Sequence, residues 1–146
     1  MLHKDFKEFL QLLNAEKVEY LLVGGYAVTF YGYPRFTGDL DIWINSNEEN
    51  TLKVMNVVNT FGFSSLGIKK EDLLNKGIVV QLGYSPVRID IITDLDGLDF
   101  AESYNNKKTS FIDGINIDII SLDDLIHNKK ATGRYKDLDD VEHLEK

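Results

Sequence analysis

The sequence contains no cysteine and no apolar run long enough to span a membrane. Without cysteine the chain cannot form a disulfide bond, a zinc–thiolate site or a thiol nucleophile. Four charged residues interrupt the N-terminal segment, Lys4, Asp5, Lys7 and Glu8, so it does not read as a secretory signal. These absences favour a cytoplasmic protein that does not enter membranes.

Positive charge is also scarce. Lysine and arginine together number 16 against 24 acidic residues, which gives a net charge of −8. Non-specific nucleic-acid binding depends on neutralising phosphates with basic side chains, so this balance argues against it. A nucleotide held through a metal ion stays possible, because the ion reverses the local field. A small acceptor, or a structured partner gripped elsewhere, is favoured over a long polynucleotide.

The length, 146 residues, fits one domain spanning residues 1–146 with an ample hydrophobic core. A double glycine follows the first apolar segment of this domain. Residues 20–23 run directly into Gly24-Gly25, a pattern that predicts a buried strand turning into a short helix. Backbone N–H groups at the start of a helix lack partners and attract anions. The turn is therefore a candidate phosphate cradle.

Two aspartates follow on the next predicted strand, residues 39–44. Alternation with a period of two places Asp39 and Asp41 on one face and three aliphatic side chains on the other. Neighbouring carboxylates repel each other unless a cation lies between them, and oxygen-only ligands suit Mg²⁺ or Mn²⁺. A phosphate cradle near a metal-binding carboxylate pair points to a nucleoside triphosphate.

Gly-Gly, thirteen residues and then Asp-Leu-Asp between hydrophobic flanks resembles the signature of the DNA polymerase β-type nucleotidyltransferase superfamily. With Arg35 and Thr37 just before Asp39, the stretch is similar to small bacterial nucleotidyltransferases. That group includes abortive-infection and toxin–antitoxin toxins and lincosamide- and aminoglycoside-modifying enzymes. The resemblance implies an α/β fold, a mixed twisted sheet flanked by helices. It also implies metal-dependent transfer of a nucleoside monophosphate to an acceptor hydroxyl, with release of pyrophosphate.

The resemblance further implies a third metal-site carboxylate on a later strand, and Asp90 in the alternating segment 87–92 matches it. The alternative is a surface ion pair between Asp90 and Arg88 or a lysine. Arg35 has two readings as well: its planar fork could contact a phosphate, or it could pair with Asp39 or Asp41.

Near the C-terminus, the resemblance implies one lysine and one arginine that face the triphosphate. Lys129 (or Lys130) and Arg134 match these positions. The alternative is that they are solvated basic side chains at a helix end. Asp137, which follows, is expected to favour the N-terminus of the last helix through its charge.

Apolar spacing predicts helices over 3–14 and 46–60, the second opened by a capping box from Ser46 to Glu49. Alternation predicts two hairpins, 77–93 and 107–120, the second turning at Asp113-Gly114. A non-catalytic nucleotide-binding or toxin–antitoxin interaction module with the same fold is the alternative function. The retained acidic residues Asp39, Asp41 and Asp90 speak against it. The acceptor carries no motif, and a homodimer or a partner protein could complete its pocket.

Overall fold

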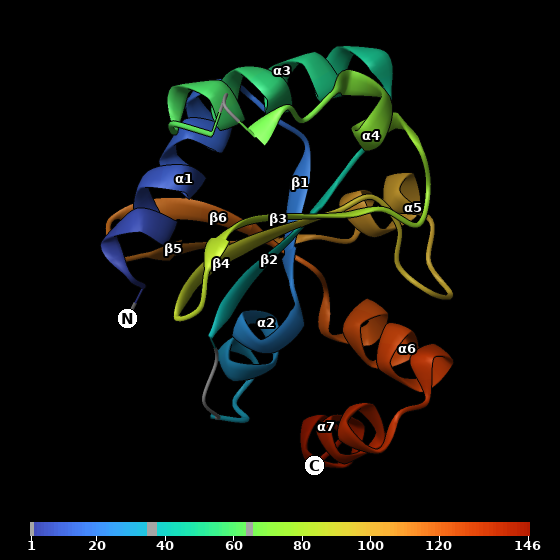
Figure 1. Ribbon diagram of the computed structural model, residues 1–146. Helices are drawn as coiled ribbons and strands as arrows, with labels where there is room; N and C mark the ends of the chain where they lie inside the picture. Colours follow the sequence, from blue (N-terminus) through green and yellow to red (C-terminus); the bar gives the residue numbers. More distant parts are fainter. Residues whose placement is uncertain (1, 35–37, 64–65) are drawn as a thin grey trace.

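A computed structural model describes residues 2–34, 38–63 and 66–146 (Figure 1). Within these ranges, seven helices flank a six-stranded sheet whose strand order is β3-β4-β2-β1-β6-β5. The elements are α1 (Lys4–Ala15), β1 (Tyr20–Val23), α2 (Gly24–Phe30), β2 (Asp39–Ile44), α3 (Glu48–Thr60), α4 (Lys70–Leu74), β3 (Val79–Tyr84), β4 (Val87–Ile92), α5 (Phe100–Asn105), β5 (Lys108–Ile112), β6 (Ile115–Ile119), α6 (Leu122–Thr132) and α7 (Tyr135–Leu144).

The sheet is mixed, as predicted. β1 is antiparallel to β2 and parallel to β6, whereas β2 is parallel to β4. Two antiparallel hairpins, β3–β4 and β5–β6, supply the two edges. This order places β2, with its two aspartates, beside β4, which carries Asp90. The α/β fold expected from the resemblance is confirmed.

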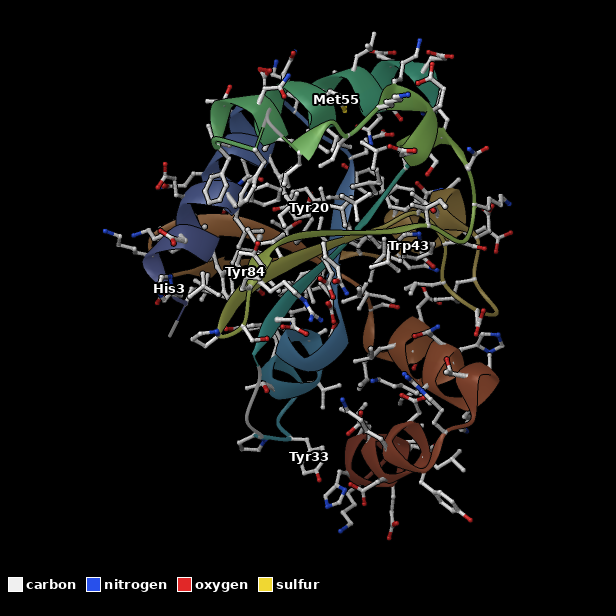
Figure 2. The ribbon with its side chains drawn as sticks, viewed as in Figure 1. His3, Tyr20, Tyr33, Trp43, Met55 and Tyr84 are labelled. Atoms are coloured by element: carbon white, nitrogen blue, oxygen red, sulfur yellow. The ribbon has the colours of Figure 1, made fainter. Side chains whose placement is uncertain are left out.

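Helices cover both faces of the sheet: α1, α3 and α4 lie on one side, and α2, α6 and α7 lie on the other (Figure 1). The aliphatic side chains of β2, Leu40, Ile42 and Ile44, are buried in the core, as alternation predicts. Trp43, on the opposite face, is also buried and packs edge-on against Phe100 of α5 (Figure 2). On this face of β2, Asp39 and Asp41 remain partly exposed.

Local signals set several of the element ends, but not the start of α3. Asp113 (φ 51°) and Gly114 (φ 85°) form the left-handed turn that joins β5 and β6. The start of α3 was predicted at Ser46, but the helix begins at Glu48. The side chain of Asn47 caps it by accepting from the Asn50 backbone N–H at 2.8 Å. Asparagine caps a helix about as well as serine, and here it lies one residue nearer the first helical turn.

In the described ranges, no helix is both long enough and apolar enough to cross a membrane.

Candidate functional site

Three carboxylates and one guanidinium meet on the α2 side of the sheet. In the parallel pairing of β2 with β4, Asp41 lies opposite Asp90 and Asp39 lies opposite Arg88. Residues directly opposite each other in a ladder point to the same face. The sequence places Asp39 and Asp41 on one face, and the sheet topology adds Asp90 to it.

Arg88 binds two of these carboxylates at once. Its Nε donates to Asp90 Oδ1 at 2.9 Å and its Nη2 to Asp90 Oδ2 at 3.1 Å, a bidentate pair. The same Nη2 also donates to Asp39 Oδ2. The Asp90–Arg88 pair that the sequence left open as an alternative is therefore present. The additional contact with Asp39 was not predicted.

Asp41 is the carboxylate left without a cationic partner among the described residues. Burial raises its pKa to about 7, helped by the negative charges of Asp90 and Asp39. Lys129 and Arg88 lower it from a distance, but not enough to offset these effects. A partly buried carboxylate crowded by like charge is stabilised by any cation that reaches it.

Gly24 lies against this carboxylate. Its φ of +68° is in the left-handed region, and a Cβ built on it would lie 2.0 Å from Asp41 Oδ2. Any side chain at this position would displace the Asp41 carboxylate. The glycine is therefore required both by the backbone conformation and by the close approach of Asp41.

Replacing Gly24 with alanine is expected to destabilise the protein and weaken metal-dependent nucleotide binding, because Asp41 must move. Gly67→Ala is a matched control, since Gly67 has the same φ of +68° and nothing lies within 4 Å of its Cβ position. Both variants bear the backbone cost of about 1–2 kcal/mol. Only Gly24→Ala should lose more than this in thermal unfolding. Equal losses in the two variants would contradict the close approach to Asp41.

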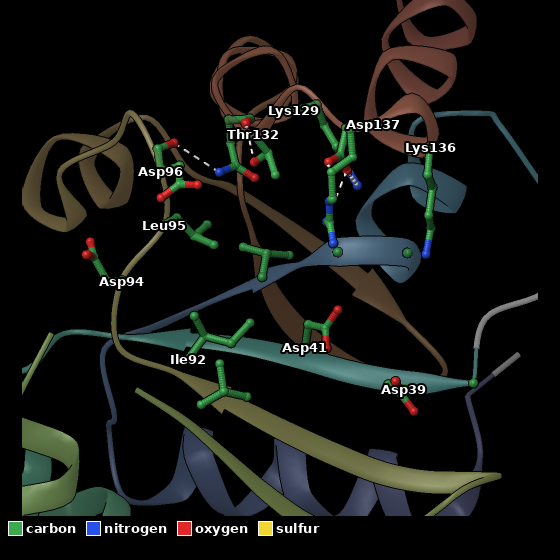
Figure 3. A pocket seen from close by; sticks show the side chains of 17 residues that line it. Asp39, Asp41, Ile92, Asp94, Leu95, Asp96, Lys129, Thr132, Lys136 and Asp137 are labelled. Atoms are coloured by element: carbon green, nitrogen blue, oxygen red, sulfur yellow. Dashed lines mark hydrogen bonds and ion pairs between the residues drawn. The ribbon is translucent and has the colours of Figure 1, made fainter. Parts of the chain in front are cut away.

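A cavity of about 360 Å³ opens between β2, the start of α2 and the α6–α7 pair (Figure 3). It brings together six predicted site residues: Gly24, Gly25, Asp39, Asp41, Lys129 and Arg134. Asp90, which Arg88 binds, is not among the lining residues. Arg35 and Thr37, also predicted, lie outside the described residues. The chain therefore collects distant motifs, separated by about a hundred residues, around one hollow.

The cations on the α6–α7 wall are held by buried acids. Lys129 Nζ lies 3.4 Å from Asp137 Oδ1 and 3.0 Å from Asp140 Oδ2, and Arg134 Nε lies 2.7 Å from Asp137 Oδ2. Burial alone would raise the pKa of Asp137, but the hydrogen bond from Arg134 and the charge of Lys129 hold it below its ordinary value. Figure 3 shows Lys129 and Asp137 together on this wall.

These contacts bear on the alternative in which the basic residues are solvated side chains at a helix end. Lys129 is 7% exposed, so the alternative of a solvated lysine is wrong for it. Lys130 points instead to the surface, where it pairs with Glu145. The side chain of Arg134 is 71% exposed but is fixed by Asp137. Asp137 lies in the first turn of α7, as expected, yet it is 1% exposed and organises the two cations.

Whether these residues fit a divalent ion depends on which oxygens are available. Across the described ranges, no group of three or more His, Cys, Asp or Glu side chains is placed to hold a metal. Arg88 takes both oxygens of Asp90 and Oδ2 of Asp39. Asp41 and Oδ1 of Asp39 remain. This pair of hard oxygen donors, beside unrelieved negative charge, fits a single Mg²⁺ or Mn²⁺ that completes its shell with water and phosphate.

Sequence reasoning missed several residues of the site. Lys136 extends from α7 into the cavity, and Asn128 and Thr132 of α6 line it (Figure 3). Arg88 was predicted only as a surface partner of Asp90, although its place two residues before Asp90 on an alternating strand sets the two side chains on one face. The residues of α6 and α7 carried no signal of this kind, because the angle at which the two helices meet the sheet is a tertiary feature.

Comparison with known proteins agrees with this geometry. The sequence profile of a family described as "Nucleotidyl transferase of unknown function (DUF2204)" matches residues 2–146. No curated protein matches the sequence. Several solved structures share the fold.

One is a Thermotoga maritima protein described as a candidate nucleotidyltransferase, TM1012, with a TM-score of 0.60 and 17% identity over 96% of this chain and 86% of that one. A second is the lincosamide antibiotic adenylyltransferase LnuA with lincomycin bound. It has a TM-score of 0.60 and 16% identity, over 99% of this chain and 97% of that one. A third is an antigenic nucleotidyltransferase-like protein from Paracoccidioides brasiliensis. It has a TM-score of 0.56 and 14% identity, over 96% of this chain and 74% of that one. At these identities the likeness is one of fold.

Proposed function

The chain belongs to the nucleotidyl transferase family of unknown function DUF2204, and we therefore propose that it transfers a nucleoside monophosphate from a nucleoside triphosphate to an acceptor hydroxyl. One observation carries the proposal. A carboxylate pair, Asp39 and Asp41, faces two fixed cations, Lys129 and Arg134, across a single cavity. A triphosphate with a divalent ion has the complementary arrangement of charge.

Each side of the cavity has its own role in this proposal. Asp39 and Asp41 hold the Mg²⁺ or Mn²⁺, which when bound neutralises phosphate charge and lowers the pKa of the acceptor hydroxyl. Gly24 and Gly25, which line the cavity, offer backbone N–H groups to the β- and γ-phosphates. On the opposite wall, basic side chains stabilise the negative charge that develops on the leaving group.

In the transfer itself, the acceptor oxygen forms a bond to the α-phosphorus, and the bond from that phosphorus to the oxygen bridging it to the β-phosphorus breaks. Pyrophosphate leaves toward Lys129 and Arg134. The hydroxyl proton passes to Asp90, whose two oxygens have lone pairs beyond those that Arg88 occupies. Asp90 does not line the cavity but lies opposite Asp41 in the β2–β4 pairing, and its part in this step rests on that position.

The nature of the acceptor follows from charge. A chain with a net charge of −8 has little means to grip a polynucleotide, so a small hydroxyl-bearing molecule is the favoured acceptor. LnuA, which shares the fold, is a lincosamide antibiotic adenylyltransferase, and its structure contains bound lincomycin. ATP and lincosamides are therefore the first donor and acceptors to screen.

Titration calorimetry with ATP, GTP, CTP and UTP in the presence of Mg²⁺ tests the proposal. At least one nucleotide is expected to bind the wild type, and Asp39→Ala should weaken that binding by more than about 100-fold, because even outer-shell partners of a metal site are worth 10- to 100-fold. Glu142→Ala, which removes an exposed carboxylate elsewhere, should bind like the wild type.

Chelation of the metal should abolish binding in all three proteins. Failure of every nucleotide to bind, or unchanged affinity in Asp39→Ala, would overturn the assignment. Tight metal-dependent binding without pyrophosphate release in a broad acceptor screen would favour the non-catalytic nucleotide-binding module.

A further inference from the structure

Arg88 has no role in the transfer described above, although its guanidinium lies among the three carboxylates. We propose that this guanidinium takes the place of a second, acceptor-side metal ion, so that the site works with one divalent cation. The inference rests on the proposed function. It extends that function in two respects: it states how many metal ions the site binds, and it gives Arg88 a role as a positioning residue.

Many phosphoryl- and nucleotidyl-transfer sites place two metal ions between shared carboxylates, one of them on the acceptor side. Here the carboxylate on the acceptor side is Asp90, and Arg88 binds both of its oxygens in a fork, at 2.9 and 3.1 Å. The side chain of Asp90 is only 10% exposed, so little solvent screens this pair. A divalent ion bound to Asp90 would lie next to a fixed positive charge and be repelled by it.

The arrangement is built into the sheet rather than into a loop. Arg88 and Asp90 share one face of β4, and the parallel register sets them opposite Asp39 and Asp41. Arg88 therefore binds Asp90 on its own strand and also reaches Asp39 Oδ2 on β2. A simple surface ion pair would engage one carboxylate. Arg88 instead bridges two carboxylates, as a metal ion shared between them would.

Arg88 also lines a second hollow of the protein. This hollow has a volume of about 340 Å³, and its other walls include Phe63, Leu66, Gln81 and Tyr84. Tyr84 stands exposed at the end of the β3–β4 hairpin (Figure 2). Among the described residues, Arg88 Nη1 makes no hydrogen bond. That nitrogen is available to an acceptor group that enters from the second hollow.

The test counts metal ions directly. Mn²⁺ is titrated into the protein saturated with a non-hydrolysable α,β-methylene nucleoside triphosphate, and bound ions are counted by electron paramagnetic resonance. The wild type is expected to bind one Mn²⁺ per chain. Arg88→Met should bind two, with the dipolar broadening of two nearby ions, because Asp90 and Asp39 Oδ2 become available.

Two variants control for charge. Arg88→Lys keeps a cation at the position and should bind one Mn²⁺. Lys70→Met removes a lysine that pairs with Glu48 on the opposite side of the sheet and should also bind one. Asp90→Asn gives a measurement that does not depend on the folding of Arg88→Met. It should still bind one ion, whereas a true two-metal site would fall from two to one.

Two Mn²⁺ ions in the wild type overturn the inference and leave the proposed function standing. A folded Arg88→Met with one ion also overturns it. A wild type that binds no Mn²⁺ in the presence of nucleotide overturns the proposed function itself. Failure of the inference and failure of the proposed function therefore give different results.

Discussion

Replacing Asp41 with asparagine is expected to abolish metal-dependent nucleotide binding and, at the same time, to make the metal-free protein more stable. Function is lost because Asp41 is the carboxylate most available to a divalent ion, and the loss should exceed about 100-fold in nucleotide affinity. Stability rises because Asp41 is ionised in a place that disfavours its charge. Burial and the carboxylates of Asp90 and Asp39 raise its pKa to about 7.

The pH dependence follows from the direction of this shift. The folded state binds the Asp41 proton more tightly than the unfolded state, whose carboxyl has the ordinary pKa of 3.8. Asp41 therefore costs nothing below about pH 4, and its destabilising effect grows as the pH rises toward about 7. Above that, the gap between the two pKa values corresponds to as much as about 4 kcal/mol.

Thermal unfolding of the metal-free proteins at pH 4.5 and pH 8 tests this. The variant should be more stable than the wild type at the higher pH, and this difference should be several-fold smaller at the lower pH. Glu142→Gln, which removes an exposed carboxylate, should show no such gap. Saturating Mg²⁺ should narrow the difference by stabilising only the wild type. An Asp41→Asn protein less stable than the wild type at pH 8 would contradict the crowding of charge at this site.

The same residue shows why part of the site could be predicted from sequence. Asp39 and Asp41 can be recognised from the sequence, because the period of two in a strand fixes which side chains share a face regardless of the neighbouring elements. Asp90 follows the same rule on its own strand. Which strand lies beside which is a matter of topology, however, and the register that sets Asp41 against Asp90 could not be obtained from spacing alone.

The fold was predictable for a similar reason. The hairpin turn at Asp113-Gly114 depends on a local conformation that few residues tolerate, and it occurs where expected. The polar cluster between α6 and α7 was not predictable, because its acids lie one helical turn apart on a helix whose burial depends on tertiary packing. Asp137 resembles a favourable first-turn acid in the sequence, and only the fold shows that it anchors two cations.

That cluster gives the second large expected effect. Replacing Lys129 with methionine, which has a similar shape, is expected to destabilise the protein by about 3 kcal/mol and to lower its Tm by roughly 10 °C. Lys129 Nζ lies within 3.4 Å of carboxylate oxygens of both Asp137 and Asp140, and each acid is 1% exposed. Removing the lysine leaves these two buried charges close together, and the estimate is at the lower end of the usual range because Arg134 still binds Asp137.

Lys130→Met is the matched control, since the neighbouring lysine is exposed and pairs with Glu145 at the surface. Its loss should cost less than about 1 kcal/mol. In the double variant Lys129→Met with Asp140→Asn, one of the two buried charges is gone, so part of the lost stability should return. Because the pKa of Asp137 lies below its ordinary value in the wild type, the stability that its ion pairs contribute is lost as the pH falls, and the deficit of Lys129→Met should also shrink. Equal effects of the two single lysine variants on unfolding would show that the buried cluster is not what holds α6 against α7.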